Sequence, residues 1–412
     1  MSDVSAASSE YRSRYATMSG SRELLEALLR FPKKDIFDCV PLHYLVLKMN
    51  GMGCITPRLG IRNGTTITTV LDVSLFVVNL VLAVSMMVYG TFFAERPLES
   101  PIMFIGVKMV NFTCYASTIY GLISCFINRH DIWKFYNQAY AIDIMLAKLG
   151  EQTNFNRSFT LFVMYYGAAM GTCLFMISIL YRGTMPWLLL LNLSYTYFSL
   201  TTFHIVSVTC VEVVWVRNLR LNRVLRRQLS LADNVVEAPT LTTSGPNQKL
   251  VLRQIMQIFD LVCDLADEGS FYYGMQIMVS ITGSFVFLLF YTFAFTLVIR
   301  SVLPFDSVLH AGPIMSYLIF LYNILIVACF GNALKQQGTI TSTLIDRAIN
   351  STNNADIIEM LRMFLMQLGH RSPILTCGLF PFDWTLIFSI LSTAATYIII
   401  LLQFESAGSS AA

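Results

Sequence analysis

Seven long apolar segments dominate this chain, and each is almost free of charged side chains. A stretch of about 20 apolar residues spans the hydrocarbon core of a bilayer as a helix. In hydrocarbon every backbone N–H and C=O group needs a partner, and a helix supplies all of them internally. The sequence therefore predicts an all-α polytopic membrane protein with seven transmembrane helices. The expected spans are residues 69–93, 101–127, 159–181, 186–216, 272–299, 313–334 and 384–404.

Composition supports this assignment and excludes several functions. Of 412 residues, 55% are hydrophobic and 13% are charged, which is about half the charged fraction of a soluble protein. The net charge of +3 is too small to indicate a nucleic-acid partner. The sequence contains no P-loop, no hydrolase motif and no His/Cys metal spacing, so we expect no enzyme activity, cofactor or metal.

Positive charge is distributed very unevenly between the two sides of the expected membrane domain. With the N-terminus placed in the cytoplasm, cytoplasmic segments hold 24 of the 28 Lys and Arg residues and the outer loops hold three. Lys and Arg accumulate on the cytoplasmic side of membrane proteins. Seven spans then place the C-terminus outside, which is opposite to the orientation of a G-protein-coupled receptor.

The ends of the spans divide the chain into functional segments. We expect a cytoplasmic N-terminal segment with residues 37–49 along the membrane surface, a six-helix domain with a cytoplasmic helix hairpin, a second cytoplasmic segment, the last span and an extracellular tail. The N-terminal segment is residues 1–68, and the six-helix domain is residues 69–334 with the hairpin at 217–271. The second cytoplasmic segment is residues 335–383, the last span 384–404 and the extracellular tail 405–412.

Two cytoplasmic patterns predict helix packing. Arginines recur every third residue from Arg217 to Arg226, and residues 260–268 carry four carboxylates on one side of a helix. We expect these basic and acidic faces of the hairpin to approach each other. Residues 356–368 form an amphipathic helix whose apolar face is available for packing between subunits; that face consists of Leu361, Phe364, Leu365 and Leu368.

The last span carries one polar stripe along an otherwise apolar helix. It has 21 residues and no charge. Steps of four, three, four, three and four residues place one set of side chains on a single helix face. Hydroxyl and amide groups gain nothing from contact with acyl chains, so this face is expected to meet something other than lipid. The stripe consists of Thr385, Ser389, Ser392, Thr396, Ile399 and Gln403.

Two explanations of the stripe remain open. Ser and Thr can donate hydrogen bonds to carbonyls of their own helix and pack closely against a neighbouring helix. Alternatively, several copies of the helix surround a water-filled path. The second explanation accounts better for Gln403, whose amide is neither small nor apolar.

The end of this span resembles a known signature. The run from Thr396 and Tyr397 to Gln403 and Phe404, TYIIILLQF, is similar to the TYhhhhhQF motif (h, hydrophobic) in the last membrane span of insect gustatory receptors. The preceding CGLFPFD, residues 377–383, also resembles that family's approach to the span. Insect odorant receptors share the architecture but generally lack the ends of the motif, so they are the second choice.

The resemblance implies a taste receptor of the plasma membrane that acts as a ligand-gated, non-selective cation channel. It implies a homotetramer, or an assembly with related subunits, whose central pore is lined by the last helix. A small-molecule tastant opens the pore to monovalent cations and calcium. Gln403 and Phe404 correspond to the outer constriction and Thr396 and Tyr397 to the inner pair of the motif. A G-protein-coupled receptor disagrees with the orientation, and a coupled transporter would need acidic residues at membrane depth and internal repeats.

The outer halves of the first six spans are rich in aromatic residues and contain no acidic side chain. Sugar sites must match every buried hydroxyl with a hydrogen-bonding group, often a carboxylate. An aromatic and sparsely polar set instead favours flat, amphipathic molecules of the kind tasted as bitter, with a sugar-activated receptor as the alternative. The candidate ligand-binding residues are Lys108, Asn111, Tyr115, Trp187, Tyr195, Tyr291, Tyr317 and Tyr322.

Overall fold

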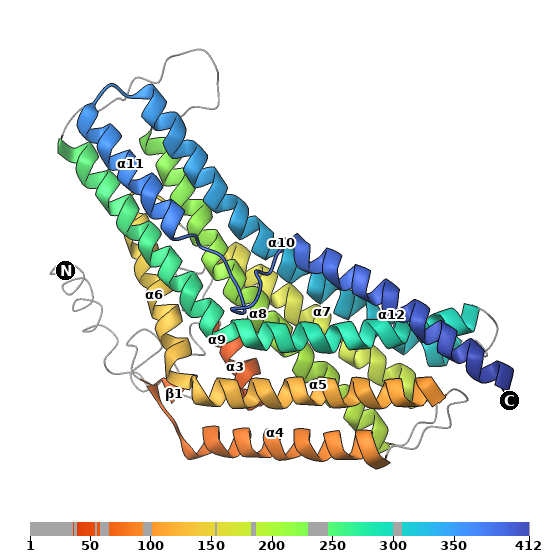
Figure 1. Ribbon diagram of the computed structural model, residues 1–412. Coiled ribbons are helices and arrows are strands. Elements are labelled where there is room, and N and C mark those ends of the chain that lie inside the picture. Colours follow the sequence, from red (N-terminus) through yellow and green to blue (C-terminus); the bar gives the residue numbers. More distant parts are fainter. Residues whose placement is uncertain are drawn as a thin grey trace.

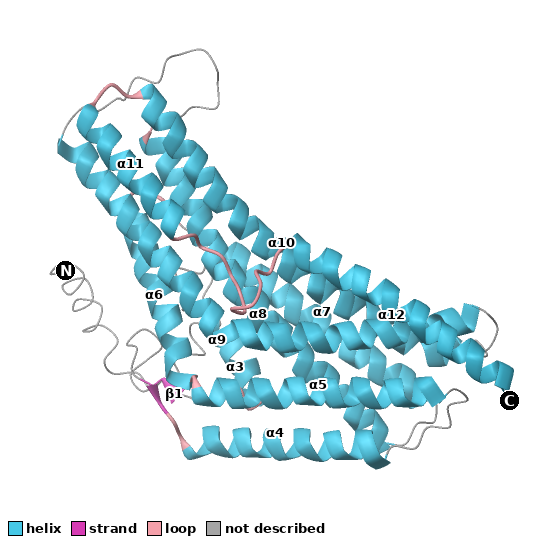
Figure 2. Ribbon diagram, viewed as in Figure 1, coloured by secondary structure: helices cyan, strands magenta, loops and turns pink. Residues whose placement is uncertain are grey.

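The computed structural model describes residues 36, 39–53, 56–57, 66–93, 101–152, 155–182, 187–229, 246–299 and 307–411, and these are almost entirely helical (Figure 2). Residues 1–35 of the expected N-terminal segment and residues 230–245 of the hairpin lie outside this description. The helices are α3 (Val40–Met49), α4 (Val70–Val88), the π-helical turn η3 (Tyr89–Phe93), α5 (Pro101–Ile127), α6 (Arg129–Lys148), α7 (Phe155–Arg182), α8 (Trp187–Gln228), α9 (Pro246–Ile299), α10 (Ser307–Ser351), α11 (Ala355–His370) and α12 (Trp384–Ala411).

The expected all-α fold class is confirmed. A two-residue antiparallel ladder between β1 (Thr56–Pro57) and β2 (Thr66–Ile67) adds a minor feature before α4. Each of the seven expected spans lies on a helix: the first on α4 with η3, and the others on α5, α7, α8, α9, α10 and α12. Within the described residues, five of these helices are long and apolar enough to cross a membrane, namely all except α7 and α10.

Three helices of the bundle are much longer than a membrane requires. α8, α9 and α10 contain 42, 54 and 45 residues, whereas about 20 residues span the hydrocarbon. They continue into a second helical region that also contains α6 and α11, at the upper left of Figure 1. The largest hydrophobic core extends through this region, where Phe135, Phe259 and Phe364 are fully buried.

The extended helices and the C-terminus lie at opposite ends of the molecule (Figure 1). α12 starts at the junction between the two helical regions and ends at the far end of the membrane bundle. Because most Lys and Arg residues lie on the side of the extension, that side is cytoplasmic and the C-terminus is extracellular.

The C-terminal end of α3, in the segment expected along the membrane surface, is hydrogen-bonded to the bundle. At the end of α3, the Asn50 side-chain nitrogen donates to the Thr202 hydroxyl of α8 at 3.2 Å. The amide of Asn79 in α4 donates to the Met49 carbonyl at 3.3 Å. Asn50 is 3% exposed. Polar side chains of two spans therefore hold the end of α3 between helices, a contact that periodicity along residues 37–49 cannot reveal.

Candidate functional site

α12 touches the rest of the chain through one narrow face. Ile387 is buried, and Ile390, Ala394, Ile398 and Leu401 are partly buried. These residues follow each other at steps of three or four and lie against α9 and α10. Only 6% of the most apolar stretch of α12 is buried, compared with 22% in α4. Among the five apolar helices identified in the described residues, α12 is the least enclosed.

The polar stripe lies on the opposite face of α12. All six of its residues, from Thr385 to Gln403, are exposed. At about 100° per residue, the centre of the stripe is about 180° around the helix from the face that packs on α9 and α10. The stripe therefore points away from its own chain, and the neighbour that it meets is not part of this chain's described residues.

The hydroxyls of the stripe do bond to their own helix, as the first explanation expected. Ser389 donates to the Thr385 carbonyl at 2.9 Å, and Thr396 donates to the Ser392 carbonyl at 3.1 Å. These bonds satisfy the hydroxyl protons but leave the oxygens at the exposed surface of the helix. Self-bonding and a water-facing position are therefore compatible.

The signature residues lie on the exposed part of α12. Tyr397 is 50% exposed, Ile399 58% and Phe404 66%, and Gln403 and Ser392 are exposed as well. The helix does not stop at Phe404: it continues through Ala411, and the Ser406 hydroxyl donates to the Gln403 carbonyl at 2.9 Å. Most of the expected tail is thus one further stretch of helix.

A buried carboxylate holds the cytoplasmic start of α12. Asp383, 4% exposed, accepts a hydrogen bond from the Thr385 backbone N–H at 3.0 Å and from the Thr385 hydroxyl. Lys335 of α10 donates to its other oxygen at 2.8 Å. The Lys335 ammonium and the Thr385 hydroxyl hold the pKa of Asp383 below its usual range. The carboxylate caps α12 and ties it to α10.

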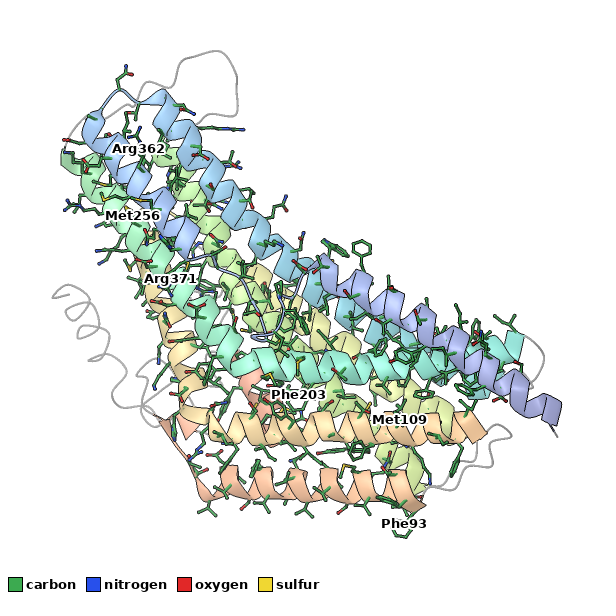
Figure 3. The ribbon with its side chains drawn as sticks, viewed as in Figure 1. Phe93, Met109, Phe203, Met256, Arg362 and Arg371 are labelled. Atoms are coloured by element: carbon green, nitrogen blue, oxygen red, sulfur yellow. The ribbon has the colours of Figure 1, made fainter. Side chains whose placement is uncertain are left out.

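Residues 371–383, which we call the linker, connect α11 to α12 through contacts with α9. Arg371 donates to Asp264 at 2.6 Å and to Asp267 at 2.8 Å; Figure 3 labels Arg371 where α11 ends beside α9. The Thr376 backbone N–H donates to the Ser270 hydroxyl at 3.1 Å. The first half of the linker is therefore bound to the helix that carries the fifth span.

Two glycines allow the linker to lie directly on helix backbone. A Cβ atom at Gly274 of α9 would be 2.4 Å from the Thr376 carbonyl oxygen, and one at Gly331 of α10 would be 1.8 Å from the Phe382 carbonyl oxygen. Any other residue would displace the linker at both points. Sequence reasoning missed these positions, although a glycine within an apolar helix is a sign of close backbone approach.

Three of the candidate ligand residues form hydrogen bonds between helices. Asn111 donates to the Gly90 carbonyl at 3.3 Å, Tyr115 to the Asn192 carbonyl at 2.8 Å, and Tyr195 to the Asn79 carbonyl at 3.0 Å. Tyr115 is fully buried. These side chains connect α4 and η3, α5 and α8, so the structure uses their polar groups to align helices.

Two other candidates belong to an aromatic group between α9 and α10. Tyr291 stacks on Phe287 with ring centroids 5.1 Å apart, and Phe287 lies 4.6 Å from Phe320. Tyr317 accepts a hydrogen bond from Thr292 at 3.5 Å. Beside this group, buried His204 of α8 lies 3.1 Å from the Ser280 hydroxyl of α9. His204 and Ser280 thus form a buried polar contact between α8 and α9.

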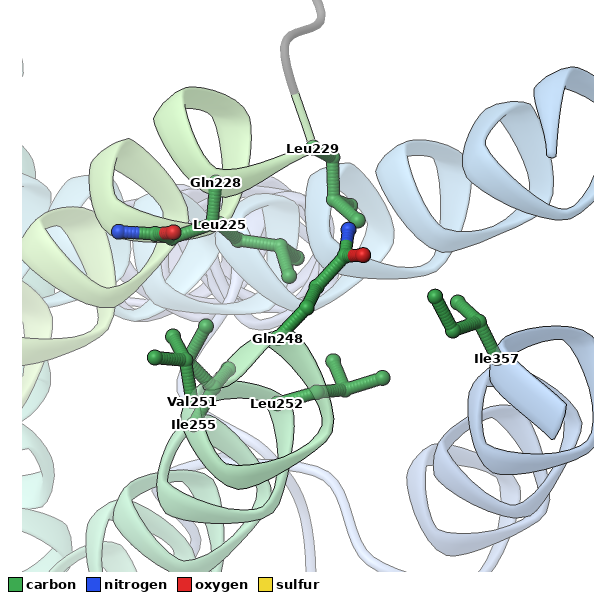
Figure 4. A pocket seen from close by; sticks show the side chains of 8 residues that line it. All are labelled: Leu225, Gln228, Leu229, Gln248, Val251, Leu252, Ile255 and Ile357. Atoms are coloured by element: carbon green, nitrogen blue, oxygen red, sulfur yellow. The ribbon is translucent and has the colours of Figure 1, made fainter. Parts of the chain in front are cut away.

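The remaining candidates do not join either group in the described contacts. The Lys108 ammonium lies 4.3 Å from the centre of the Phe104 ring, one turn away on α5. Tyr322 is 49% exposed, and the side chain of Trp187 lies outside the described residues. A pocket in the described part of the chain is formed by residues of α8, α9 and α11 in the cytoplasmic extension and by none of these candidates (Figure 4). It is lined by Leu225, Gln228, Leu229, Gln248, Val251, Leu252, Ile255 and Ile357.

The expected approach of the basic and acidic faces in the hairpin is wrong. Arg217 and Arg220 of α8 bind Asp143 of α6, the latter at 2.5 Å, and Arg223 is 3.4 Å from Glu151, just after α6. Asp264 and Asp267 of α9 bind Arg371 instead. The sequence contained both charged faces, but α6, which was not expected as a separate helix, supplies the nearest carboxylates.

The apolar face of α11 is also used differently from the expectation. Leu361 and Phe364 are fully buried within the same chain, and the Phe364 ring lies 5.4 Å from Phe259 of α9. Leu365 and Leu368 are partly buried against the same core, so this face packs within its own chain. The opposite face of α11 is exposed and includes Met363 and Met366.

Comparisons with known proteins agree on one family. The family model described as 7tm chemosensory receptor matches residues 40–408. Putative gustatory receptor 28b of Drosophila melanogaster is 26% identical over 196 residues, which are 46% of this chain and 41% of that protein. Putative gustatory receptor 28a of the same organism is 28% identical over 165 residues, 39% of this chain and 36% of that protein. The matches thus span less than half the length of these curated relatives.

A solved structure has a similar fold. The insect olfactory receptor OR5 from Machilis hrabei, in complex with eugenol, aligns with a TM-score of 0.63 over 89% of this chain and 97% of that one. The structure of OR5 described without eugenol aligns with a TM-score of 0.62 over the same shares. Sequence identity is 10% in both alignments, so the likeness concerns the fold.

Proposed function

Because the chain belongs to the 7tm chemosensory receptor family, as the resemblance of residues 396–404 predicted, we propose that it is a taste receptor that acts as a ligand-gated cation channel. Four copies surround a central pore lined by α12. A small-molecule tastant opens this pore to monovalent cations and calcium across the plasma membrane. The family is one of receptors and not of enzymes, in agreement with the missing catalytic motifs.

The observation that carries this proposal is the exposed polar stripe of α12. Its hydroxyls and the Gln403 amide lie about 180° from the face that packs on the chain. In a monomer, this stripe would lie against acyl chains, where the Gln403 amide would lack hydrogen-bond partners. A symmetric assembly removes this desolvation penalty, because the identical stripes then face one another across water.

The connections of α12 indicate how a ligand signal reaches it. In our proposal, residues 69–334 sense the ligand, residues 335–383 belong to the cytoplasmic anchor between subunits, and residues 384–404 line the pore. The linker is bound to α9 through Arg371 and Thr376, and Lys335 of α10 holds Asp383 at the start of α12. A shift of α9 or α10 around a ligand is therefore transmitted to the base of the pore helix.

The side chains between α9 and α10 support an amphipathic, bitter-type ligand. Phe287, Tyr291, Tyr317 and Phe320 supply aromatic surface, and the Thr292 and Tyr317 hydroxyls lie beside it. The carbonyl partners of Asn111, Tyr115 and Tyr195 reduce the hydrogen-bonding capacity left for a sugar. A sugar-activated receptor and a channel of the odorant-receptor type are the alternatives. An inverted orientation argues against a G-protein-coupled receptor.

The pore assignment is tested by two substitutions on α12 at equally exposed sites. Ile399 on the stripe is 58% exposed and Leu391, about 120° from the centre of the stripe, is 55% exposed. We expect Ile399→Ser to raise the current without ligand several-fold by hydrating the pore, and Leu391→Ser to leave it unchanged. Equal effects of the two substitutions in channels that reach the surface would show that the stripe does not line the pore.

The receptor assignment is tested by calcium entry in cells that express only this chain. A panel of plant alkaloids and phenolics should produce a prompt signal without added G protein, and simple sugars should produce none. Strong responses to sugars alone would refute the bitter-type assignment while preserving the channel. A response that depends on G-protein signalling would refute the channel itself.

A further inference from the structure

α8 and α10 share a polar seam where the membrane bundle meets the cytoplasmic extension. We define this seam by Trp215, Asn218 and Asn222 of α8 and by Gln337 and Thr341 of α10. The Asn222 amide donates to the backbone carbonyl and the side-chain oxygen of Gln337, both at 3.0 Å. The Thr341 hydroxyl donates to the Asn222 side-chain oxygen at 2.7 Å. At its cytoplasmic end, the seam is therefore hydrogen-bonded directly between protein groups.

At the membrane end of the seam, the polar groups of Trp215 and Asn218 have no hydrogen-bond partners among the described residues. Asn218 is 0% exposed, and neither its side-chain nitrogen nor its side-chain oxygen has a hydrogen-bond partner among the described residues. The buried indole N–H of Trp215 also lacks a partner there. Buried amide and indole groups almost always bond to protein or to ordered water.

These unsatisfied groups share one face of α8. Trp215, Asn218 and Asn222 follow at steps of three and four residues. The Trp215 ring packs on Phe330 of α10, with centroids 5.7 Å apart, and Asn222 bonds to Gln337 of α10. Asn218 lies between these two contacts along α8 and is fully buried.

We propose that the seam binds ordered water between Trp215 and Asn218. The groups offer three donor hydrogens, one on the indole nitrogen and two on the amide nitrogen, and one acceptor atom, the amide oxygen. A metal cation could use only the acceptor and an anion only the donors. Water accepts and donates at once, and a buried water typically makes about three hydrogen bonds. The seam therefore continues toward the membrane bundle as a water-mediated contact between α8 and α10.

The first test is a cryo-EM map of the full-length protein in lipid nanodiscs, at a resolution of about 2.5 Å or better so that ordered water is visible. We expect density within hydrogen-bond distance of the Trp215 indole nitrogen and of the Asn218 side-chain oxygen. A well-resolved seam in which both atoms contact only protein carbon would overturn the proposal.

The second test is a double-mutant cycle on thermal stability of the purified protein. A shared water makes the two residues depend on each other, so Trp215→Phe and Asn218→Leu should each lower the melting temperature, by about 2–4 °C. The double variant should lose clearly less than the sum, because the second substitution removes a group that the first had already left dry.

A dry seam gives the opposite result. Asn218→Leu would then replace an unpaired amide with an apolar group and leave the melting temperature unchanged or raise it. Additive effects in the cycle would also overturn the proposal. Asn222→Leu with Trp215→Phe is the control pair. Asn222 lies about 10 Å from Trp215 along the helix and bonds directly to protein groups, so the effects of these two substitutions on the melting temperature should add.

Discussion

Phe404 is a large apolar side chain on the exposed side of the proposed pore helix, and 66% of it is accessible in a single chain. Four copies around an axis would form an apolar ring, which stops ions by excluding water. Phe404→Ala should widen this ring and raise the current in the absence of ligand several-fold, as measured by patch clamp. Phe388, 68% exposed and about 60° from the centre of the stripe at the inner end of the same helix, tests where along the helix the ring constricts the pore. If the Phe388→Ala and Phe404→Ala channels carry equal current in the absence of ligand, the constriction is not at Phe404.

Asp383 gives the base of α12 a defined pH dependence. Its pKa is below the ordinary value because Lys335 and Thr385 bind the carboxylate. A lowered folded-state pKa adds stability above the unfolded pKa of about 3.9, and this stability is lost as pH falls through the folded-state pKa. Asp383→Asn should therefore cost about 1–2 kcal/mol at neutral pH, through the weakened cap and ion pair. Melting curves should show this difference constant from pH 5 to 8 and smaller below pH 4.

At the scale of elements, the contact between the linker and α10 depends on a missing side chain. A Cβ at Gly331 would meet the Phe382 carbonyl at 1.8 Å, whereas nothing lies within 4 Å of a Cβ at Gly369 of α11. Gly331→Ala should destabilise the protein by about 1–3 kcal/mol and shift the ligand concentration needed for half-maximal current. Gly369→Ala should be neutral or slightly stabilising, because alanine favours a helix. Equal melting temperatures for both variants would show that the close approach has no energetic role.

At the scale of the whole molecule, the charge distribution and the seven-helix bundle predict the orientation. An epitope after Ala412 should be stained in intact cells, and an epitope before Met1 only after permeabilisation. The physical reason is that Lys and Arg resist transfer across the membrane, so the loops that carry them stay in the cytoplasm. Staining with the opposite pattern would exclude both the proposed channel and the extracellular position of the α12 end.

The sequence by itself was sufficient for features that depend on neighbouring residues along one helix. The thickness of hydrocarbon and the demand for internal backbone hydrogen bonds define the spans locally. The polar stripe of α12 depends only on helical spacing, and the structure places it on one exposed face. The signature at residues 396–404 likewise lies within one helix, and it predicted the family correctly.

Only the tertiary structure decided which distant residues meet. Arg217 binds Asp143, 74 residues away, because α6 packs beside α8. Phe364 packs on Phe259 of α9 in its own chain, and Tyr115 bonds to a carbonyl of α8. An amphipathic face or a buried hydroxyl indicates that a packing or hydrogen-bond partner is required, but it does not identify that partner. The choice follows from how the helices are arranged in three dimensions, since the free energy of such contacts depends on distance and geometry and not on separation along the chain.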